Sequence, residues 1–203
     1  MIQKDTIYND NDELMAKTLR TIDDNGKLIT LVEITYSPDR KIRTVISKDV
    51  NGNLFQKKVE YRGTKHLAHK PIRDVTVSYA DWDLTVPLFT IKNEFTWDKD
   101  AECKTIKTDY YDNKDELVWT KRIKCFKVVD GKKTGTYVMT KSKGDRLLEK
   151  VTTRYFYKDD KKIKKVIKTQ NFEINMSTIE TKTYEGGIHI ETEEFYNSEF
   201  KPD

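Results

Sequence analysis

The sequence predicts an all-β protein built as an antiparallel meander or sandwich. Apolar and polar residues alternate with a period of two in many segments. In residues 147–157, for example, Val151 and Tyr155 fall on one face of an extended chain, and Lys150 and Arg154 fall on the other. Turn signals such as "DDNGK" and "VDGK" separate these segments, and Asn-Gly and Asp-Gly favour tight hairpin turns. No long window shows convincing helical periodicity.

The alternation favours strands along most of the chain. The clearest segments are 28–36, 75–79, 89–97, 147–157 and 188–190. The weak helical candidates are 12–22, disfavoured by its Thr and Arg content, and 65–73, which Pro71 would end. Residues 63–87 contain Pro71 and Pro87 and are the best candidate for a linker or long loop.

A turn near the N-terminus recurs in the second half of the chain. Tyr8–Leu14 matches Tyr111–Leu117 about a hundred positions later, and three further turns follow in the same order. We therefore expect two related β modules from an internal duplication. The expected division is a first module core at 1–64, a linking loop with additional strands at 65–95, and a second module at 96–203.

The repeated unit, a Tyr before an Asp/Asn turn and then an apolar strand, is loosely similar to YD-type β repeats. The matching residues are Tyr8, Asp10 and Leu14, and Tyr111, Asp112 and Leu117. Both copies lack the glycine usual in that pattern, so no family is assigned.

The composition favours thin, well-solvated β-structure. Charged residues make up 35% of the 203 residues and hydrophobic residues only 36%. The 11 Tyr, 8 Phe and 3 Trp nevertheless argue against a disordered chain. The excess of Lys over Arg and the scarcity of Ala suggest an AT-rich genome, such as that of a low-GC bacterium, its phage or some protozoa.

The N-terminus and the two cysteines bear on the cellular setting. Residues 1–13 show no signal-peptide pattern, and no run is long and apolar enough to span a membrane. We expect a cytoplasmic protein, or one incorporated into a particle assembled in the cytoplasm. In that reducing setting Cys103 and Cys125 are free thiols; the alternative is a disulfide between neighbouring strands.

The histidines and acidic turns offer weak metal-site candidates. His66 and His69 could share an ion with Asp74, Asp81 or Asp83, but two loop histidines without a metal are the preferred interpretation. His189 is interpreted as a solvated strand residue. The acidic stretch 9–13 lacks the glycine and distant glutamate of a calcium loop, and Asx-turn formation explains it.

No catalytic constellation is visible, so we expect no enzymatic activity, no cofactor and no metal. Lysines around Cys125 could lower the pKa of its thiol. The preferred interpretation is that Leu117, Trp119, Ile123 and Cys125 share a buried face and that the thiol is inert packing.

Charge distribution is the strongest signal. Residues 121–168 hold 17 Lys or Arg against 5 Asp or Glu, a net charge of +12, whereas 170–203 hold 2 against 8. The expected polyanion-binding residues are Arg154, Lys161, Lys162, Lys164 and Lys165. The alternative is neutralisation of the basic segment by cross-strand pairing with the acidic tail.

These observations favour a non-enzymatic structural or protein-binding protein that acts with a protein partner or by self-assembly. An oligomeric assembly subunit of a phage or bacterial particle is the specific expectation. The alternatives are a nucleic-acid-binding module that uses the basic segment, and a small-molecule-binding β-sandwich or enzyme.

Overall fold

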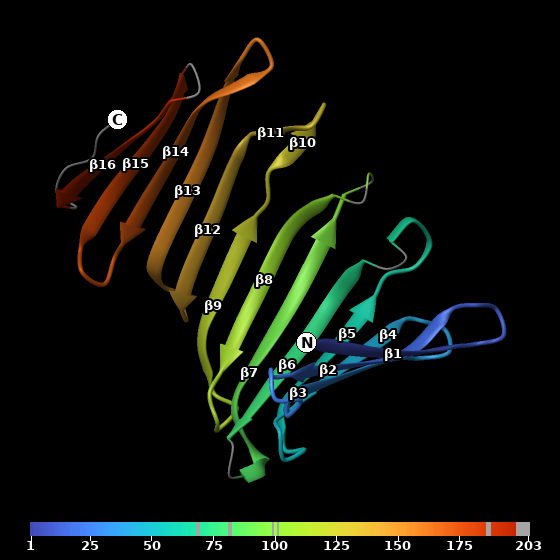
Figure 1. Cartoon of the computed structure of the whole chain (residues 1–203). Coiled ribbons are helices and arrows are strands. Elements are labelled where there is room, and N and C mark those ends of the chain that lie inside the picture. The colour runs from blue at the N-terminus through green and yellow to red at the C-terminus, as the bar shows by residue number, and fades with distance from the viewer. Residues whose placement is uncertain (68–69, 81–82, 99, 101, 186–187, 198–203) are drawn as a thin grey trace. The chain divides into compact units, whose positions relative to one another are not determined.

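The computed structural model describes residues 1–203 except 68–69, 81–82, 99, 101, 186–187 and 198–203. It confirms the all-β prediction, in the form of an antiparallel meander (Figure 1). Hydrogen-bonded neighbours follow the order β1 to β9 and then β12 to β16, so nearly every strand pairs with the strands next to it in sequence. Among the described residues, no helix is long and apolar enough to cross a membrane.

The chain divides into two compact units. Unit 1 comprises Met1–Phe95 and Asp109–Val118, and unit 2 comprises Thr96–Thr108 and Trp119–Asp203. The elements that lie wholly or mainly in unit 1 are β1 (Ile2–Tyr8), β2 (Leu14–Ile22), β3 (Leu28–Tyr36), β4 (Ile42–Lys48), β5 (Leu54–Arg62), the 3-10 helix η1 (Lys65–Leu67), β6 (Pro71–Ala80) and β7 (Asp83–Trp97).

The remaining strands lie wholly or mainly in unit 2. They are β8 (Cys103–Tyr111), β9 (Leu117–Lys124), β10 (Lys127–Val129), β11 (Lys132–Thr134), β12 (Thr136–Lys143), β13 (Arg146–Lys158), β14 (Lys161–Asn171), β15 (Met176–Glu185) and β16 (Ile188–Asn197). The short strands β10 and β11 pair only with each other and form a hairpin between β9 and β12.

The segment expected to be a linker or long loop is mostly strand. Residues 63–87 contain η1, all of β6 and the start of β7, so the expected long loop is wrong. Pro71 is tolerated because it opens β6, where a missing N–H disturbs the ladder least. The candidate helix at 12–22 is likewise a strand, β2, whereas a short helical turn does form within 65–73. The three-part division of the chain stays a prediction.

Several hairpin turns share one side-chain mechanism, and its presence at Asn9 confirms the Asx-turn interpretation of the acidic stretch 9–13. The Asn9 Oδ1 accepts hydrogen bonds from the backbone N–H groups of Asn11 and Glu13, at 3.0 and 2.9 Å. The Asp112 Oδ1 does the same for Lys114 and Glu116, at 2.9 and 3.0 Å. A carboxylate or amide placed this way substitutes for a backbone acceptor and fixes the turn.

This turn bears on the predicted duplication. The same bonding pattern recurs at Asp23, Asp49 and Asp98. The pair that opens the proposed repeat therefore shares a turn that is common along the chain. The next proposed pair differs, because Asp130 and Gly131 form a tight turn with positive φ at both residues. The internal duplication stays a prediction.

Very little of the chain is a hydrophobic core. Among the described residues, Ile34 and Leu148 are the only fully buried apolar side chains, each 8% exposed. Most strand residues are half-buried, because each is covered by its cross-strand neighbours and by the aliphatic stems of lysines. In β13 the predicted alternation holds from Thr153 to Lys158. Leu148 breaks it because the β12–β13 register shifts between Lys141 and Ser142.

Candidate polyanion-binding face

Strand registers in unit 2 gather positive side chains on one face. Arg122 lies opposite Thr140, which lies opposite Lys150, so these two cations share a face of β9, β12 and β13. The β13–β14 register then adds Lys164 opposite Phe156. We call this set the cationic face; its members are Arg122, Lys124, Lys150, Arg154, Lys158, Lys161, Lys164 and Lys168.

No acidic side chain lies on this face of the four described strands. Its other residues are uncharged, among them Val, Thr, Ser, Phe and Gln, because the acid of β13, Glu149, lies opposite Lys141 on the other face. None of the eight cations forms an ion pair with a described residue; Arg154 Nε instead donates to the Thr136 hydroxyl at 3.0 Å. The face is therefore a positive surface without internal neutralisation.

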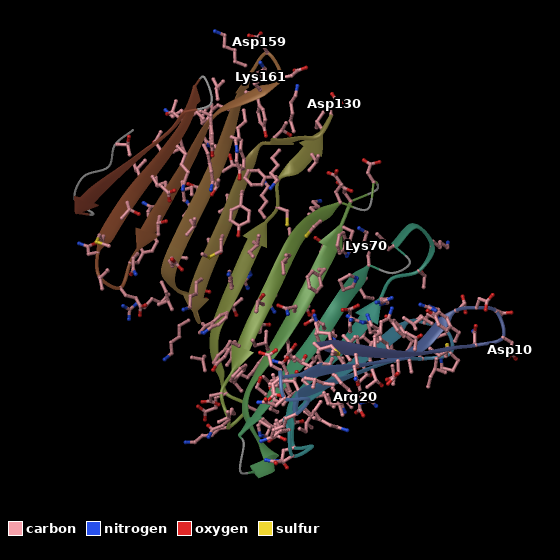
Figure 2. The ribbon with its side chains drawn as sticks, viewed as in Figure 1. Asp10, Arg20, Lys70, Asp130, Asp159 and Lys161 are labelled. Carbon is pink, nitrogen blue, oxygen red and sulfur yellow. The ribbon has the colours of Figure 1, made fainter. Side chains whose placement is uncertain are left out.

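The cationic face is open to solvent. Six of its cations are exposed, and only Lys150 and Lys168 are half-buried. One aromatic ring, that of Phe156, stands among them with 43% of its surface exposed. Lys158 and Lys161 lie at the end of the β13–β14 hairpin, where Figure 2 labels Lys161 next to Asp159.

The opposite face of unit 2 carries the aromatic residues. Phe126 stacks with Tyr137 at 5.7 Å between ring centroids and contacts Tyr155 at 5.1 Å. Lys162 Nζ lies 4.1 Å from the centroid of the Tyr184 ring. We call this the aromatic face. Lys133, Lys141 and Lys162 lie over its rings, so their charge is partly used within the fold.

The structure divides the five predicted polyanion-binding residues between these two faces. Arg154, Lys161 and Lys164 belong to the cationic face, whereas Lys162 and Lys165 lie on the aromatic face, opposite Tyr157 and Tyr155. Sequence reasoning missed the other members of the cationic face. They are Arg122, Lys124, Lys150, Lys158 and Lys168. Counting every second residue in each predicted strand would have found most of them.

The acidic tail does not neutralise β14 directly. Its strand β16 pairs with β15, so β15 separates it from β14. By register Glu191 lies opposite Lys182, which is on the aromatic face and already pairs with Glu180 at 2.8 Å. Glu194 of β16 lies opposite Ile179 of β15, and by register this position is on the same side of the sheet as the cationic face.

One ion pair joins the β10–β11 hairpin to the end of β13–β14. Lys132 Nζ lies 2.5 Å from Asp160 Oδ1. This hydrogen bond lowers the pKa of the Asp160 carboxyl and raises that of the Lys132 ammonium. Nearby, Lys133 donates its backbone N–H to the Tyr157 hydroxyl at 3.1 Å. These contacts place the hairpin along β13.

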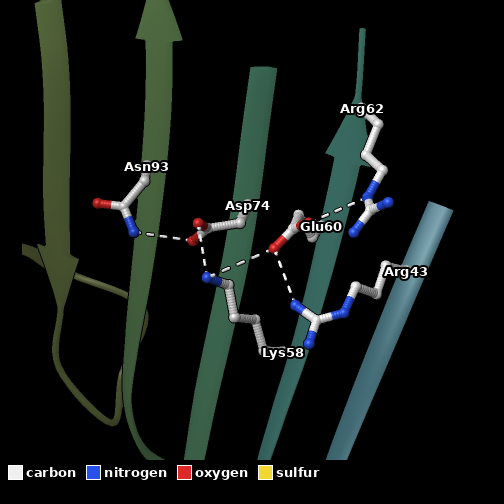
Figure 3. A network of polar contacts seen from close by, with 6 residues as sticks. All are labelled: Arg43, Lys58, Glu60, Arg62, Asp74 and Asn93. Atoms are coloured by element: carbon white, nitrogen blue, oxygen red, sulfur yellow. Dashed lines mark hydrogen bonds and ion pairs between the residues drawn. The ribbon is translucent and has the colours of Figure 1, made fainter. Parts of the chain in front are cut away.

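Unit 1 uses charge differently, in a buried network across β4 to β7 (Figure 3). Asp74, only 1% exposed, accepts a hydrogen bond from Asn93 at 2.8 Å and pairs with Lys58 at 3.0 Å. Glu60 pairs with Arg43 at 3.3 Å and with Arg62 at 3.1 Å. Arg43, Glu60, Asp74 and Asn93 lie opposite one another in register, so the network crosses four strands in one line.

The network serves the fold. Glu60 is engaged by Arg43 of the neighbouring strand and by Arg62 of its own strand, and Asp74 is engaged by Lys58 of the neighbouring strand. Asp74, a candidate metal ligand from the sequence, is thus an ion-pair partner of Lys58. Among the described residues, no group of three or more His, Cys, Asp and Glu could hold a metal ion. His69 and Asp81 lie outside the described residues, and the side chains of His66, Asp83 and His189 are not described.

The two cysteines are free thiols, and they are neighbours. Cys125 Sγ lies 3.0 Å from Cys103 Sγ. Both side chains are half-buried, and Leu117 is 49% exposed, so the fully buried face expected around Cys125 does not exist. The inert-packing interpretation is therefore wrong in its premise.

No protein-family model matches the chain, and no curated protein matches its sequence.

Proposed function

We propose that unit 2 binds single-stranded nucleic acid on the cationic face. The observation that carries the proposal is the set of eight cations on one face of β9, β12, β13 and β14 without an acidic side chain among them. Lysines and arginines on one sheet face stand about 5 to 7 Å apart, which suits repeated contact with a phosphate backbone.

Phe156 favours a single strand over a duplex. An exposed ring can stack only on a base that is not already stacked in a double helix. Arg154 and Lys158 lie two residues before and two residues after it in β13, and Lys164 lies directly opposite it. Backbone contact and base stacking would thus be combined at one place, as in sequence-tolerant single-strand binders.

The test is fluorescence anisotropy of a labelled single-stranded oligonucleotide titrated with the full chain at several salt concentrations. Log K should fall linearly with log salt, with a slope of about −0.7 for each phosphate neutralised. Phe156→Ala should lower the affinity by about 1–3 kcal/mol if a base stacks on the ring. Absence of binding at low salt would refute the proposal, as would binding to heparin but not to the oligonucleotide.

A matched pair of variants distinguishes binding to the cationic face from binding that depends only on the protein's net charge. The triple variant Lys124→Glu, Arg154→Glu, Lys164→Glu should abolish binding. The control triple Lys121→Glu, Lys141→Glu, Lys165→Glu makes the same charge change on the aromatic face and should retain most of it. Equal loss in the two variants, both checked for folding by circular dichroism, would mean that the protein's overall charge drives binding.

A second candidate function is protein binding through the edge strand β1, which would make the protein a non-enzymatic assembly component. Among the described strands β1 pairs only with β2, and its outer hydrogen-bonding groups face no other strand. Ile2 and Ile7 are 70% and 64% exposed. Open apolar edges accept a strand from a partner or a second copy. The more specific proposal, that the protein is an assembly subunit of a phage or bacterial particle, comes from the sequence alone.

Native mass measurement at micromolar concentration tests it. Assembly through β1 predicts oligomers or a co-purifying partner, and Thr6→Pro, which cannot donate at the edge, should dissociate them. Asp10→Pro in the adjoining turn is the control for the effect of proline, because the hydrogen bonds of that turn come from the N–H groups of Asn11, Asp12 and Glu13. A stable monomer without partners would refute the assembly function.

A further inference from the structure

Cys103 and Cys125 are positioned to react with each other. Their sulfur atoms lie 3.0 Å apart, with Cys125 donating its S–H to the Cys103 sulfur. Cys103 is the first residue of β8, and Cys125 follows directly after β9. The backbone N–H of Cys125 donates to the Lys104 carbonyl at 3.0 Å, which holds the two segments together. Side chains on adjacent antiparallel segments have the approach that a cross-strand disulfide needs.

Small molecules can reach the pair. Both cysteines line a cavity of about 480 Å³ in unit 2. Asp98, Asp100 and Glu102, between β7 and β8, contribute one wall, and Phe126 together with β10 contributes the other. The Glu102 carboxylate accepts a hydrogen bond from the Val128 N–H at 3.2 Å across the cavity. The thiols are therefore half-buried and also accessible to an oxidant of a few atoms.

We propose that Cys103 and Cys125 form a redox modification site that peroxide converts reversibly into an intrachain disulfide. The Cys125 thiolate attacks one oxygen of hydrogen peroxide, the O–O bond breaks, and the protonated leaving group departs as water. Cys125 is then a sulfenic acid. The Cys103 sulfur attacks the Cys125 sulfur, the S–O bond breaks, and the hydroxyl leaves with the Cys103 proton as a second water. Two thiols are oxidised by two electrons, and one peroxide is reduced to two waters.

The environment assigns the two roles. Burial, the hydrogen bond with Cys125 and the charge of Cys125 together raise the pKa of the Cys103 thiol to about 12. Cys103 thus stays protonated at neutral pH while Cys125 reacts first, because the thiolate is the nucleophile. Once Cys125 is oxidised, two of the three causes that hold the Cys103 pKa up are removed. Its proton then leaves more readily, which favours closure of the disulfide.

Closure would tie the start of β8 to the base of the β10–β11 hairpin. Both walls of the cavity would then be covalently joined beside the existing contact between Glu102 and Val128. Of the residues that line the cavity, only Lys124 belongs to the cationic face, and the reaction of the two thiols does not use it. The redox proposal therefore stands independently of nucleic-acid binding.

The experiment treats the reduced full chain with hydrogen peroxide and follows free thiols, intact mass and non-reducing electrophoresis. Both thiols should disappear together, and the mass of the chain should fall by two hydrogen atoms. Non-reducing electrophoresis should show no covalently linked dimer. A thiol reductant should restore both thiols. The rate should rise with pH, because the thiolate is the form of a cysteine that attacks peroxide.

Two single variants test the order of events. In Cys103→Ser, dimedone should trap a sulfenic acid on Cys125, because the resolving thiol is gone. In Cys125→Ser, Cys103 should react many-fold more slowly. Folding of both is checked by circular dichroism. Independent loss of the two thiols, covalent dimers as the main product, or thiols that react only after denaturation would overturn the proposal.

Discussion

The two units place their charges in opposite ways. In unit 1, Glu60 and Asp74 are buried among Arg43, Lys58 and Arg62, and each carboxylate pairs with a cation on a neighbouring strand. In unit 2, eight cations share one face of β9, β12, β13 and β14, and no acid lies on that face of these four described strands. Similar residues thus hold strands together in one place and leave a positive surface in the other. The difference shows that charge content alone says little about function; what matters is which side chains share a face.

The largest expected effect comes from breaking the buried network. Asp74→Ala should lower the free energy of unfolding by about 3 kcal/mol, because Lys58 and Asn93 each lose a partner within the buried network. Chemical denaturation measures this loss.

A double replacement sharpens that result. Lys58→Met with Asp74→Leu removes both charges and should cost less than Asp74→Ala alone, since no unpaired charge remains. If the double variant is the less stable of the two, then the ion pair itself contributes net stability.

A matched pair of arginine substitutions compares the units directly. Arg43→Gln should destabilise the protein by about 1 kcal/mol, because Glu60 loses one of its partners. Arg154→Gln should leave stability unchanged or raise it slightly, since it relieves repulsion on the cationic face. It should also weaken oligonucleotide binding and reduce the salt slope by about 0.7. Equal destabilisation by the two variants would remove the distinction between the units.

The pH dependence of unit 1 offers a smaller effect at an exposed turn. Hydrogen bonds from the Ser37 hydroxyl and from Lys41 lower the pKa of the Asp39 carboxyl from 3.8 to about 2. A folded-state pKa below the unfolded value stabilises the fold above about pH 4, and this contribution is lost as the pH falls towards 2. An NMR titration should place the Asp39 midpoint near 2, and Ser37→Ala should raise it. An unchanged midpoint in Ser37→Ala would exclude the hydroxyl as the main cause.

The smallest effect is expected at the exposed pair of Lys132 and Asp160 in unit 2. The pKa of Asp160 is lowered by Lys132, so the pair stabilises the fold at neutral pH and loses this contribution as the pH falls through the acid range. Asp160→Asn should therefore lower the melting temperature slightly at pH 7 and not at low pH. Because the pair is exposed, high salt should remove most of the difference. A difference that persists in high salt would mean that the hydrogen bond, and not the charge, stabilises the turn.

Local sequence patterns were sufficient to predict the fold class and the turns. Alternation in segments such as 147–157 predicted strands, and the acidic stretch that begins at Asn9 predicted an Asx turn. Both features depend on residues close in sequence. Leu148 escaped prediction because a register shift moved it, and shifts depend on the paired strand.

The candidate site was predictable only in part for the same reason. The basic segment was evident, but a shift between Phe156 and Tyr157 decides that Lys164 joins the cationic face while Lys162 does not. Asp74 looked like a metal ligand because its partner Lys58 lies on another strand. The contact between Cys103 and Cys125 likewise depends on pairing of segments that the sequence separates by 22 positions.

The pairing of each strand with its neighbours in sequence has a consequence for how the protein comes apart. Because most strands pair with their neighbours in sequence, the loops to be closed are short, and folding should be fast for a β protein. Unfolding need not be all-or-none: terminal strands such as β1 can detach while β4 to β6 remain paired through the buried network. Under mechanical tension applied at the ends, such a chain should yield hairpin by hairpin. Hydrogen exchange should accordingly be fastest in β1 and slowest around Asp74.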